Sequence, residues 1–242
     1  MNRLVPDPVF LLSSVRSGST LLRCVLDSHS MVHSPHELHL AKLRVVLADE
    51  FGEGAMGVLG VTRWDLEHLL WDRLLHRELV RSGKRVIVEK TPDSLCHWER
   101  LRECWPDARY IFLLRHPAHI VDSLYSAHPE LGRERLYEEH LERFVAPMRL
   151  ARESLDGITV RYEDFTADPA AEARRVCAYL GVPWEPTMLE YGRVSRRFRY
   201  GIGDWGDRIR SGRVQSTRSL PLPDDVPDQL RDWCRAWGYM PA

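Results

Sequence analysis

A run of small polar residues around one arginine, Ser14-Val15-Arg16-Ser17-Gly18-Ser19-Thr20, has the composition of an anion-binding turn. It follows a short apolar stretch and precedes a helical pattern. A tight glycine turn in that place lets backbone N–H groups and a helix N-terminus face one anion, and Ser19 and Thr20 add hydroxyl donors. A nucleotide-triphosphate P-loop would carry an earlier glycine and a lysine after Gly18, whereas this turn carries Arg16 before it. The plainer alternative is a strand–turn–helix in which a serine caps the helix.

A second element combines an arginine with a serine in the helix that follows it. Arg115 stands at the end of an apolar run, and Pro117, two residues later, is a favoured first residue of a helix. Ser123 then falls in the second turn of that helix. Because parallel sheets bind ligands at the carboxyl ends of their strands, Arg115 and Ser123 are placed to donate to one phosphate. The alternative is a surface arginine and a solvated helix serine.

Two glutamates and a pair of histidines are the candidates for an acid–base group. Glu37 is the first choice, and its neighbours His36 and His39 are the third. Glu89 is the second choice, because it ends a core strand beside Lys90. Glu37 has a structural alternative as an acid that a helix N-terminus favours, and Glu89 has one as the partner of a nearby arginine.

Strand-like and helical patterns alternate along the chain, and this order predicts a single α/β domain with a mostly parallel central sheet flanked by helices on both faces. Glycine-rich residues 51–62 are expected to form a mobile loop. Short apolar runs predict strands over 9–14, 31–34, 85–88, 109–114 and 158–162. Helical spacing predicts helices over 19–26, 35–47, 64–81, 117–125, 134–154, 169–180 and 225–237.

Composition excludes several classes of protein. A chain of 242 residues fits one domain, and a net charge of −1 gives no field that would favour nucleic acid. No apolar run approaches the roughly 20 residues of a membrane span, and residues 1–8 lack the pattern of a secretory signal, so a cytoplasmic protein is expected. The five cysteines are scattered without a CxxC or Cys/His cluster, so neither a zinc site nor a disulfide framework is expected.

Taken together, the two anion-binding elements resemble those of the sulfotransferases that use 3′-phosphoadenosine 5′-phosphosulfate (PAPS). LLSSVRSGSTLLRCVLDSH resembles the strand–loop–helix of that family, and RHPAHIVDS resembles its R-x7-S element. SPHELHL, EKTPDSL and VRYEDFTADP resemble further family segments. The likeness is greatest to the bacterial branch that includes sulfotransferase domains of polyketide synthases. It covers most of residues 9–205 and is weakest in 52–82 and after 205.

The resemblance implies a P-loop-like fold and a set of site residues. The turn would hold the 5′-phosphosulfate, and Arg115 with Ser123 would hold the 3′-phosphate. Glu37 matches the acid that several branches place after the first helix. The product would be adenosine 3′,5′-bisphosphate (PAP), and no metal is expected. The implied PAPS-binding residues are Arg16, Ser17, Gly18, Ser19, Thr20, Leu21, Arg115, Ser123, Tyr162 and Trp205, and the catalytic candidates are Glu37, Glu89, Arg16 and His39.

The resemblance leaves the acceptor open. Residues 52–82 are expected to lie on the acceptor side and 192–218 to cover the nucleotide, with Trp205 stacked on adenine and Arg208, Arg210 or Arg213 within reach of phosphate. Many family members carry lysine where Arg16 stands, so its role should be electrostatic. The late Gly203-Asp204-Trp205 replaces the Gly-Asp-Pro of bacterial relatives, so their acceptor chemistry does not transfer directly.

The expected acceptor is therefore a hydroxyl of a small molecule, lipid, sugar or carrier-tethered chain. Two other functions fit the same sequence. One is a P-loop nucleotide kinase or NTPase, and the other is an inactive nucleotide-binding protein on the same fold.

Overall fold

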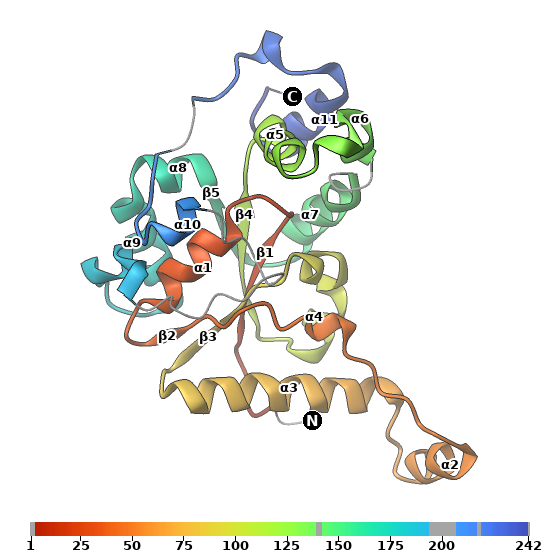
Figure 1. Ribbon diagram of the computed structural model, residues 1–242. Coiled ribbons are helices and arrows are strands. Elements are labelled where there is room, and N and C mark those ends of the chain that lie inside the picture. The colour runs from red at the N-terminus through yellow and green to blue at the C-terminus, as the bar shows by residue number, and fades with distance from the viewer. Residues whose placement is uncertain (1–2, 139–141, 194–206, 217–218, 242) are drawn as a thin grey trace.

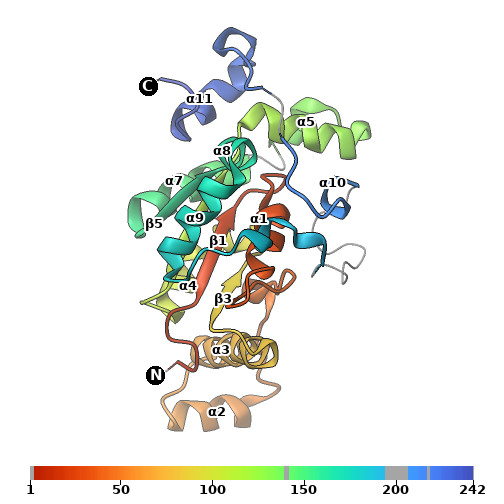
Figure 2. The same cartoon turned by 90° about the vertical axis from the view of Figure 1, so that its left-hand side faces the viewer.

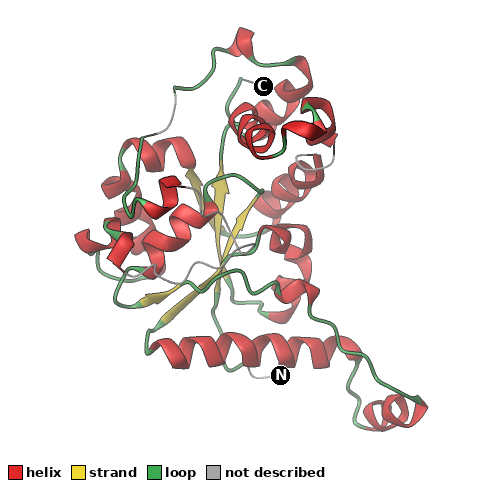
Figure 3. Cartoon of the chain, viewed as in Figure 1, coloured by secondary structure: helices red, strands yellow, loops and turns green. Residues whose placement is uncertain are grey.

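A parallel sheet of five strands forms the centre of the molecule in the computed structural model, which describes residues 3–138, 142–193, 207–216 and 219–241 (Figures 1 and 3). The strand order is β2-β3-β1-β4-β5, and each neighbouring pair is parallel. The strands are β1 (Val9–Ser13), β2 (Val32–His33), β3 (Val86–Glu89), β4 (Arg109–Leu114) and β5 (Gly157–Arg161). This architecture confirms the α/β domain that the sequence predicts.

The alternation of side chains along the strands divides the core into two layers. Val9 and Leu11 of β1 point to one face, where α1 and α9 contribute Val25 and Val176 to the same apolar cluster. Phe10 and its alternating neighbours point to the other face, where α3, α4, α5, α7 and α11 pack. Because both faces are covered, the strands are almost wholly apolar, as in other parallel sheets.

The helices that cover the sheet differ greatly in length, from four to twenty residues. No helix within the described ranges is long and apolar enough to cross a membrane. They are α1 (Ser19–Asp27), α2 (Glu50–Val58), α3 (Arg63–Ser82), α4 (Trp98–Cys104), α5 (Pro117–Ala127), α6 (Arg133–Leu136), α7 (Glu142–Ser154), α8 (Tyr162–Ala167), α9 (Pro169–Leu180), α10 (Asp207–Arg210) and α11 (Asp228–Ala236).

The glycine-rich segment 51–62, expected as a loop, contains a helix, α2. The Asp49 side chain accepts the Gly52 N–H at 2.9 Å and so caps the helix, and Glu50 and Glu53 lie in its first turn, where the helix dipole favours acids. The prediction was wrong because glycine content outweighed these start signals. Thr62 and Asp65 then form the capping box that begins α3.

The helix expected over 35–47 is absent, and only a 3₁₀ turn at Leu40–Lys42 forms there. His39 stands directly before that turn with φ 51°, a left-handed conformation that a helix cannot continue through. Beyond the turn the backbone runs extended, and the Val45 N–H donates to the Glu67 carboxylate at 3.2 Å instead of to a helical carbonyl. Tertiary hydrogen bonding therefore overrides the helical spacing of the apolar residues.

Two further boundaries differ from the sequence prediction. The helix expected over 134–154 corresponds to α6 at Arg133–Leu136 and α7 at Glu142–Ser154, and residues 139–141 between them lie outside the described part of the chain. The strand expected to include Tyr162 ends at Arg161, and Tyr162 begins the short helix α8. This second shift matters for the site, because it places the Tyr162 ring at the carboxyl edge of the sheet rather than in the sheet itself.

The sheet brings its polar residues together at one edge. β1 leads into the turn before α1, β4 leads into Arg115 and α5, and β5 leads into Tyr162 and α8. β1 is the central strand, with β3 on one side and β4 on the other, so the chain changes direction across it. Such a reversal opens a crevice at the carboxyl ends of the strands, where ligands of α/β proteins bind.

Candidate active site

The turn between β1 and α1 holds two residues in left-handed conformations. Gly18 has φ 88° and is the N-cap of α1, and Arg16 has φ 57°, which is uncommon for any residue with a Cβ. Gly18 has no side chain to cap the helix, so the first N–H groups of α1 point out of its N-terminus without a side-chain cap. The turn therefore presents the amides and positive helix end that an anion requires.

Gly18 is required at its position by more than its backbone angle. A Cβ placed on it would lie 2.2 Å from Cδ2 of Tyr162. The Tyr162 ring therefore packs directly on the turn, and its other neighbour is Arg115, whose guanidinium carbon lies 4.5 Å from the ring centroid. Three separate segments of the chain meet at this ring.

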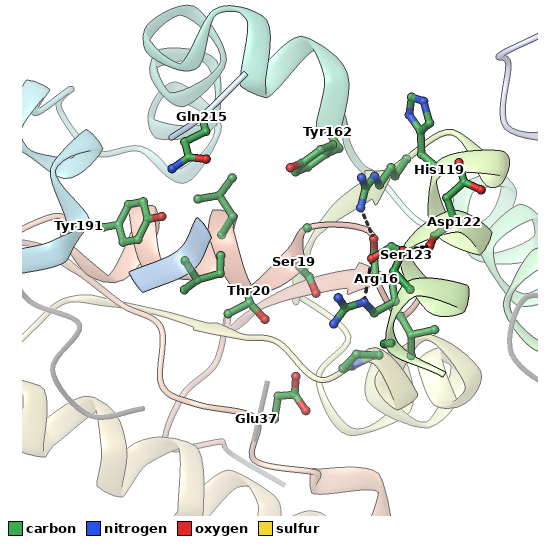
Figure 4. Close-up of a pocket in the computed structure, with 18 of the residues that line it drawn as sticks. Arg16, Ser19, Thr20, Glu37, His119, Asp122, Ser123, Tyr162, Tyr191 and Gln215 are labelled. Atoms are coloured by element: carbon green, nitrogen blue, oxygen red, sulfur yellow. Dashed lines mark hydrogen bonds between the residues drawn. The ribbon is translucent and has the colours of Figure 1, made fainter. Parts of the chain in front are cut away.

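Arg16 and Arg115 join the two anion-binding elements. Arg115 donates to the Arg16 carbonyl oxygen at 2.8 Å, and Arg16 Nε donates to Ser123 Oγ at 3.0 Å, as Figure 4 shows. These bonds connect the turn that follows β1 to the residues that follow β4, namely Arg115 and the helix α5. β1 and β4 are neighbours in the sheet. These two bonds fix Arg16 in its left-handed conformation.

A cavity of about 630 Å³ opens where these elements meet. This volume suits a ligand of nucleotide size. Ten of the site residues expected from the sequence line the cavity: Arg16, Gly18, Ser19, Thr20, Leu21, Glu37, Arg115, Ser123, Tyr162 and Arg213.

Three other expected residues lie near the cavity but do not line it. Ser17 is buried under the turn and donates to the Ser14 carbonyl at 2.8 Å. Glu89 is buried and is not among the residues that line the cavity, and His39 lies beside Glu37. Trp205 lies outside the described residues, and so do the other residues of 194–206.

The Glu37 carboxylate has a polar partner on each oxygen. Oε1 pairs with Nζ of Lys90, and Oε2 lies 3.5 Å from Nε2 of His39. Lys90 Nζ also reaches Thr20 Oγ1 at 3.5 Å, although the Lys90 side chain is only 1% exposed. Burial lowers the pKa of Lys90, and the Glu37 carboxylate opposes that shift. The Glu37–Lys90 ion pair therefore connects the cavity wall to Thr20, in the first turn of α1.

Glu89 has a different environment, because none of its hydrogen-bond partners lines the cavity. Thr91 Oγ1 donates to it at 2.5 Å and Ser94 Oγ at 3.1 Å, and the Leu38 amide adds a third hydrogen bond. Burial raises the pKa of Glu89 despite these bonds. Thr91 Oγ1 in turn accepts the His39 N–H at 3.1 Å. Glu89 thus orders the segment that carries Glu37 and touches no cavity surface.

Several cavity residues were not singled out from the sequence. His119 and Ser126 line the cavity one helical turn before and after Ser123, and Asp122 lies beside it. Helical spacing from Ser123 at i−4 and i+3 would have found the first two. Tyr191 and Gln215 also line the cavity but carry no motif that could have identified them.

The described parts of 192–218 lie against the cavity. Ile209, Arg213 and Gln215 line it. The Gly192 N–H donates to the Gly212 carbonyl at 3.2 Å, and a Cβ on Gly192 would lie 2.8 Å from Gly212 Cα. This close approach of two backbones sets the ends of the segment beside the nucleotide-sized space. None of the residues 52–82 is among those that line the cavity, so their expected acceptor-side role stays a prediction.

Behind the cavity, Glu163 ties α5 to the C-terminal helix. Its carboxylate accepts the His116 N–H at 3.0 Å and the Tyr239 hydroxyl at 2.7 Å, and His119 Nδ1 lies 3.6 Å away. Burial opposes ionisation of Glu163, but these polar neighbours outweigh it and lower the pKa of the carboxyl. Cys234 of α11 lies 3.7 Å from His116 Nε2.

No three His, Cys, Asp or Glu side chains within the described part of the chain are grouped as metal ligands. The expectation that no metal takes part stays a prediction. The charged groups of the cavity wall are Arg16, Arg115, Arg213, Glu37 and Asp122, and Asp122 is paired with Arg133 at 2.6 Å. Cationic groups therefore exceed unpaired acids around the space, which favours an anionic ligand.

The fold and the cavity define an α/β protein with a cavity of nucleotide size, lined by cationic side chains, at the carboxyl edge of its sheet. Comparison with known proteins gives the family: the model of the sulfotransferase family matches residues 8–186. This chain belongs to the sulfotransferase family, as the resemblance of its motifs implied.

Individual relatives agree with the family but match only part of their own length. Protein-tyrosine sulfotransferase A of Caenorhabditis elegans is 22% identical over 208 residues, which are 80% of this chain and 54% of that protein. The chain spans about half the length of the curated relatives it matches.

Solved structures share the fold. A sulfotransferase domain from the curacin biosynthetic pathway superposes with a TM-score of 0.72 at 24% identity, covering 99% of both chains. The mouse sulfotransferase SULT7A1 complexed with PAP superposes with a TM-score of 0.54 at 14% identity, covering 97% of this chain and 84% of that one.

The contact between Gly18 and Tyr162 predicts that Gly18→Ala loses most of its affinity for PAP, because the methyl group displaces the ring that packs on the turn. Gly181→Ala is the matched control: Gly181 has φ 69° but open space around it, so this variant carries the backbone strain without the clash. Calorimetric titration with PAP measures both. Equal affinities for PAP in the two variants would contradict this account of the turn.

The environment of His116 predicts a pH-dependent stability. Burial and the neighbouring His119 lower the pKa of His116 from 6.5 to about 4, and the neutral ring accepts the Ala118 N–H at 3.2 Å. Between pH 6.5 and 4, His116 is therefore protonated in the unfolded chain and neutral in the folded protein. The free energy of unfolding should therefore fall as pH drops through the window, by on the order of 2 kcal/mol.

Urea unfolding at several pH values tests this dependence. His116→Asn retains an acceptor for the Ala118 N–H but does not titrate, so it should lose less stability between pH 6.5 and 4 than the wild-type protein. The same loss in both proteins would assign the dependence to other groups.

Proposed function

We propose that this protein transfers a sulfuryl group from PAPS to a hydroxyl of an acceptor. The observation that carries the proposal is the pair of hydrogen bonds that join the turn after β1 to α5, from Arg115 to the Arg16 carbonyl and from Arg16 to Ser123. They hold together, on the wall of one cavity, the two elements that the sequence leads us to expect as anion-binding. The family match and the PAP complex of a mouse sulfotransferase with the same fold support this ligand.

The residues present fit a nucleotide with a charged group at each end. One end would be held by the N–H groups at the start of α1, with the hydroxyls of Ser19 and Thr20. The other would be held by Arg115 and Ser123, both on the cavity wall. The missing side chain at Gly18 leaves the backbone open to close approach, as phosphate loops require.

The chemistry needs stabilisation of negative charge on the leaving 5′-phosphate. PAPS supplies the sulfuryl group, and the bond to that phosphate breaks as the acceptor oxygen attacks in line. The guanidinium of Arg16 and the amides of the turn are fixed before any ligand binds, because Arg16 is held by Ser123 and Arg115. Donors that are already oriented stabilise developing charge without a cost of rearrangement.

Glu37 is the group placed to accept the proton of the attacking hydroxyl. It lines the cavity, whereas Glu89 does not. Lys90 pairs with one oxygen of the Glu37 carboxylate and so holds the carboxylate at the cavity wall, within reach of a bound hydroxyl. Glu89 acts as a positioning residue, since it holds Thr91, which in turn holds the His39 backbone.

The family match counts against the alternative of a P-loop kinase or NTPase. The sequence of the turn also counts against it, because a P-loop has lysine after its last glycine and this chain has Ser19 after Gly18. An affinity for PAP that exceeds that for ATP and needs no Mg²⁺ would separate the two functions. An inactive binding protein would bind PAP and transfer no sulfate to any acceptor in a broad panel.

The acceptor class is a hydroxyl on a small molecule, lipid, sugar or carrier-tethered chain. The shared fold with a sulfotransferase domain from a biosynthetic pathway supports the small-molecule and carrier-tethered classes. A cytoplasmic location fits the use of PAPS and is part of the proposal. Each acceptor class can be tested by incubating its members with PAPS and the protein. Mass spectrometry of the acceptor would then detect a gain of about 80 Da, the mass of the transferred SO₃ group.

Loss of the Arg115 guanidinium tests the placement of the ligand. Arg115→Ala should weaken PAP binding about 30-fold or more, since it removes a charge-assisted contact worth about 2 kcal/mol and the support of the Arg16 carbonyl. Arg109→Ala is the matched control, because Arg109 lies at the opposite end of the same strand, β4. Calorimetry that found equal losses in both variants would place the ligand elsewhere.

Neutralising Glu37 tests the base. Glu37→Gln should lower kcat by about 10²–10⁴-fold while PAP affinity stays near that of the wild type. Glu89→Gln is the comparison: it should lower the free energy of unfolding, because Glu89 is buried among hydrogen bonds, and keep most of the kcat. If instead Glu89→Gln lost turnover and Glu37→Gln did not, the two roles would be reversed.

A further inference from the structure

The helix α2 has an apolar face that no other described part of the chain covers. Phe51, Ala55, Val58 and Leu59 recur at i, i+4, i+7 and i+8 and so form one stripe along the helix. Phe51 is 88% and Val58 89% exposed. No residue of α2 is buried. An amphipathic helix of this kind normally packs its apolar stripe against other protein.

The helix is also too short and too rich in glycine to persist alone. It has nine residues, three of which are glycine. Isolated helices of fewer than about 12–15 residues are marginal in water, and glycine disfavours them further. The capping by Asp49 supports only the first turn. A helix with this sequence therefore needs a partner surface for its stability.

The base of the segment that carries α2 is held firmly. Residues 43–62, here called the α2 arm, leave and rejoin the body near Glu67, which accepts the Val45 N–H and pairs with Arg44 at 3.2 Å and Arg100 at 2.6 Å. The Arg100 guanidinium lies 4.0 Å from the ring centroid of Trp64 and 4.5 Å from that of Trp71. The arm thus projects from an ordered base, beyond one end of α3 (Figures 1 and 2).

The exposed side of α3 has the complementary character. Its buried residues, such as Trp71 and Leu75, face the body. The opposite side is here called the α3 stripe, and it consists of Leu69, Leu70, Arg73, Arg77, Val80 and Arg81, all exposed. Apolar side chains on this stripe alternate with arginines. Arg77 and Arg81 share Glu78, so the stripe keeps a net positive charge.

The charges of the two surfaces are opposite. Asp49, Glu50 and Glu53 flank the apolar stripe of α2, and Glu53 also lies 3.8 Å from Arg63 at the start of α3. The single basic residue of the α2 arm, Arg44, is paired with Glu67 at its base, so the arm keeps a net negative charge. We infer that the α2 arm of one copy of this chain packs on the α3 stripe of a second copy, and that the reciprocal contact closes a symmetric dimer. The acidic flanks of α2 make an anionic membrane or a nucleic acid an unsuitable surface for it.

Symmetry makes the reciprocal contact the natural outcome. Each copy offers both an arm and a stripe, so a twofold axis satisfies both in both copies and closes the assembly. Specific interfaces bury about 800 Å² on each partner, which two such contacts approach more readily than one short helix does. The two surfaces lie at the end of the molecule opposite to α5, so dimer formation leaves the cavity open (Figure 1).

Sedimentation of the full chain tests the inference first. The wild-type protein should be a dimer. Phe51→Asp combined with Val58→Asp should raise the dissociation constant about 100-fold or more, because a charge would enter an apolar contact. The fold of the body should survive, since α2 buries no residue in it, and unchanged affinity for PAP is the check. A wild-type protein that sediments as a monomer would overturn the inference.

A charge exchange then tests which surfaces meet. Glu50→Arg with Glu53→Arg makes the arm basic, and Arg73→Glu with Arg77→Glu makes the stripe acidic. Each double variant alone should be monomeric, and an equimolar mixture should form a heterodimer, because each arm then meets a stripe of opposite charge. Arg149→Glu is the control, an exposed arginine of α7 outside the stripe, and it should remain dimeric.

The other outcomes each count against the α2–α3 contact. A dimer that survives in the stripe variant alone would show that the arms pack on something other than α3. A mixture that stays monomeric would exclude the reciprocal contact. Binding of the wild-type protein to anionic vesicles as a monomer, lost in the stripe variant, would assign the stripe to a membrane surface instead.

Discussion

The hydrogen bond from Arg115 to the Arg16 carbonyl is the contact on which the arrangement of the site depends. It joins segments that are 99 residues apart in the chain and sets the distance between the two anion-binding elements. Arg16 adopts a left-handed backbone that is costly for an arginine, and such strain persists only where the surroundings fix it. The bond to Ser123 and the packing of Tyr162 on Gly18 supply the remaining fixation. A ligand with charge at both ends would meet donors already in place.

The ion pair of Glu37 and Lys90 is a second constraint on the site, and it acts through buried charge. A lysine that is almost fully buried is costly unless a carboxylate compensates it. Glu37 provides that carboxylate and also lines the cavity, so the proposed base is at the same time the partner of a buried ammonium group. For this reason the effect of any change at Glu37 includes the response of a buried ammonium group. Glu89, whose pKa is raised by burial, stabilises the same segment from below without facing the ligand.

The sequence predicted the sheet, most of the helices that cover it and ten of the residues that line the cavity. These features depend on local patterns: apolar runs, proline at a helix start and a glycine turn between strand and helix. One failure was local, because the glycine content of 51–62 outweighed the start signals of α2. The other failures depended on contacts between distant segments. The helix expected over 35–47 is replaced by extended chain because Glu67 takes the Val45 N–H. Tyr191 and Gln215 join the site only through folding, and no motif marks them.

The C-terminal helix is coupled to the ligand site through Glu163. This carboxylate accepts the amide of His116, next to Arg115, and the hydroxyl of Tyr239, just beyond α11. Local opening of α11 would break the second bond and loosen the support of the first. A ligand that holds the loop at Arg115 therefore lowers the population of the opened state. Amides of α11 would exchange with deuterium more slowly in the complex, although this helix contributes no residue to the cavity wall.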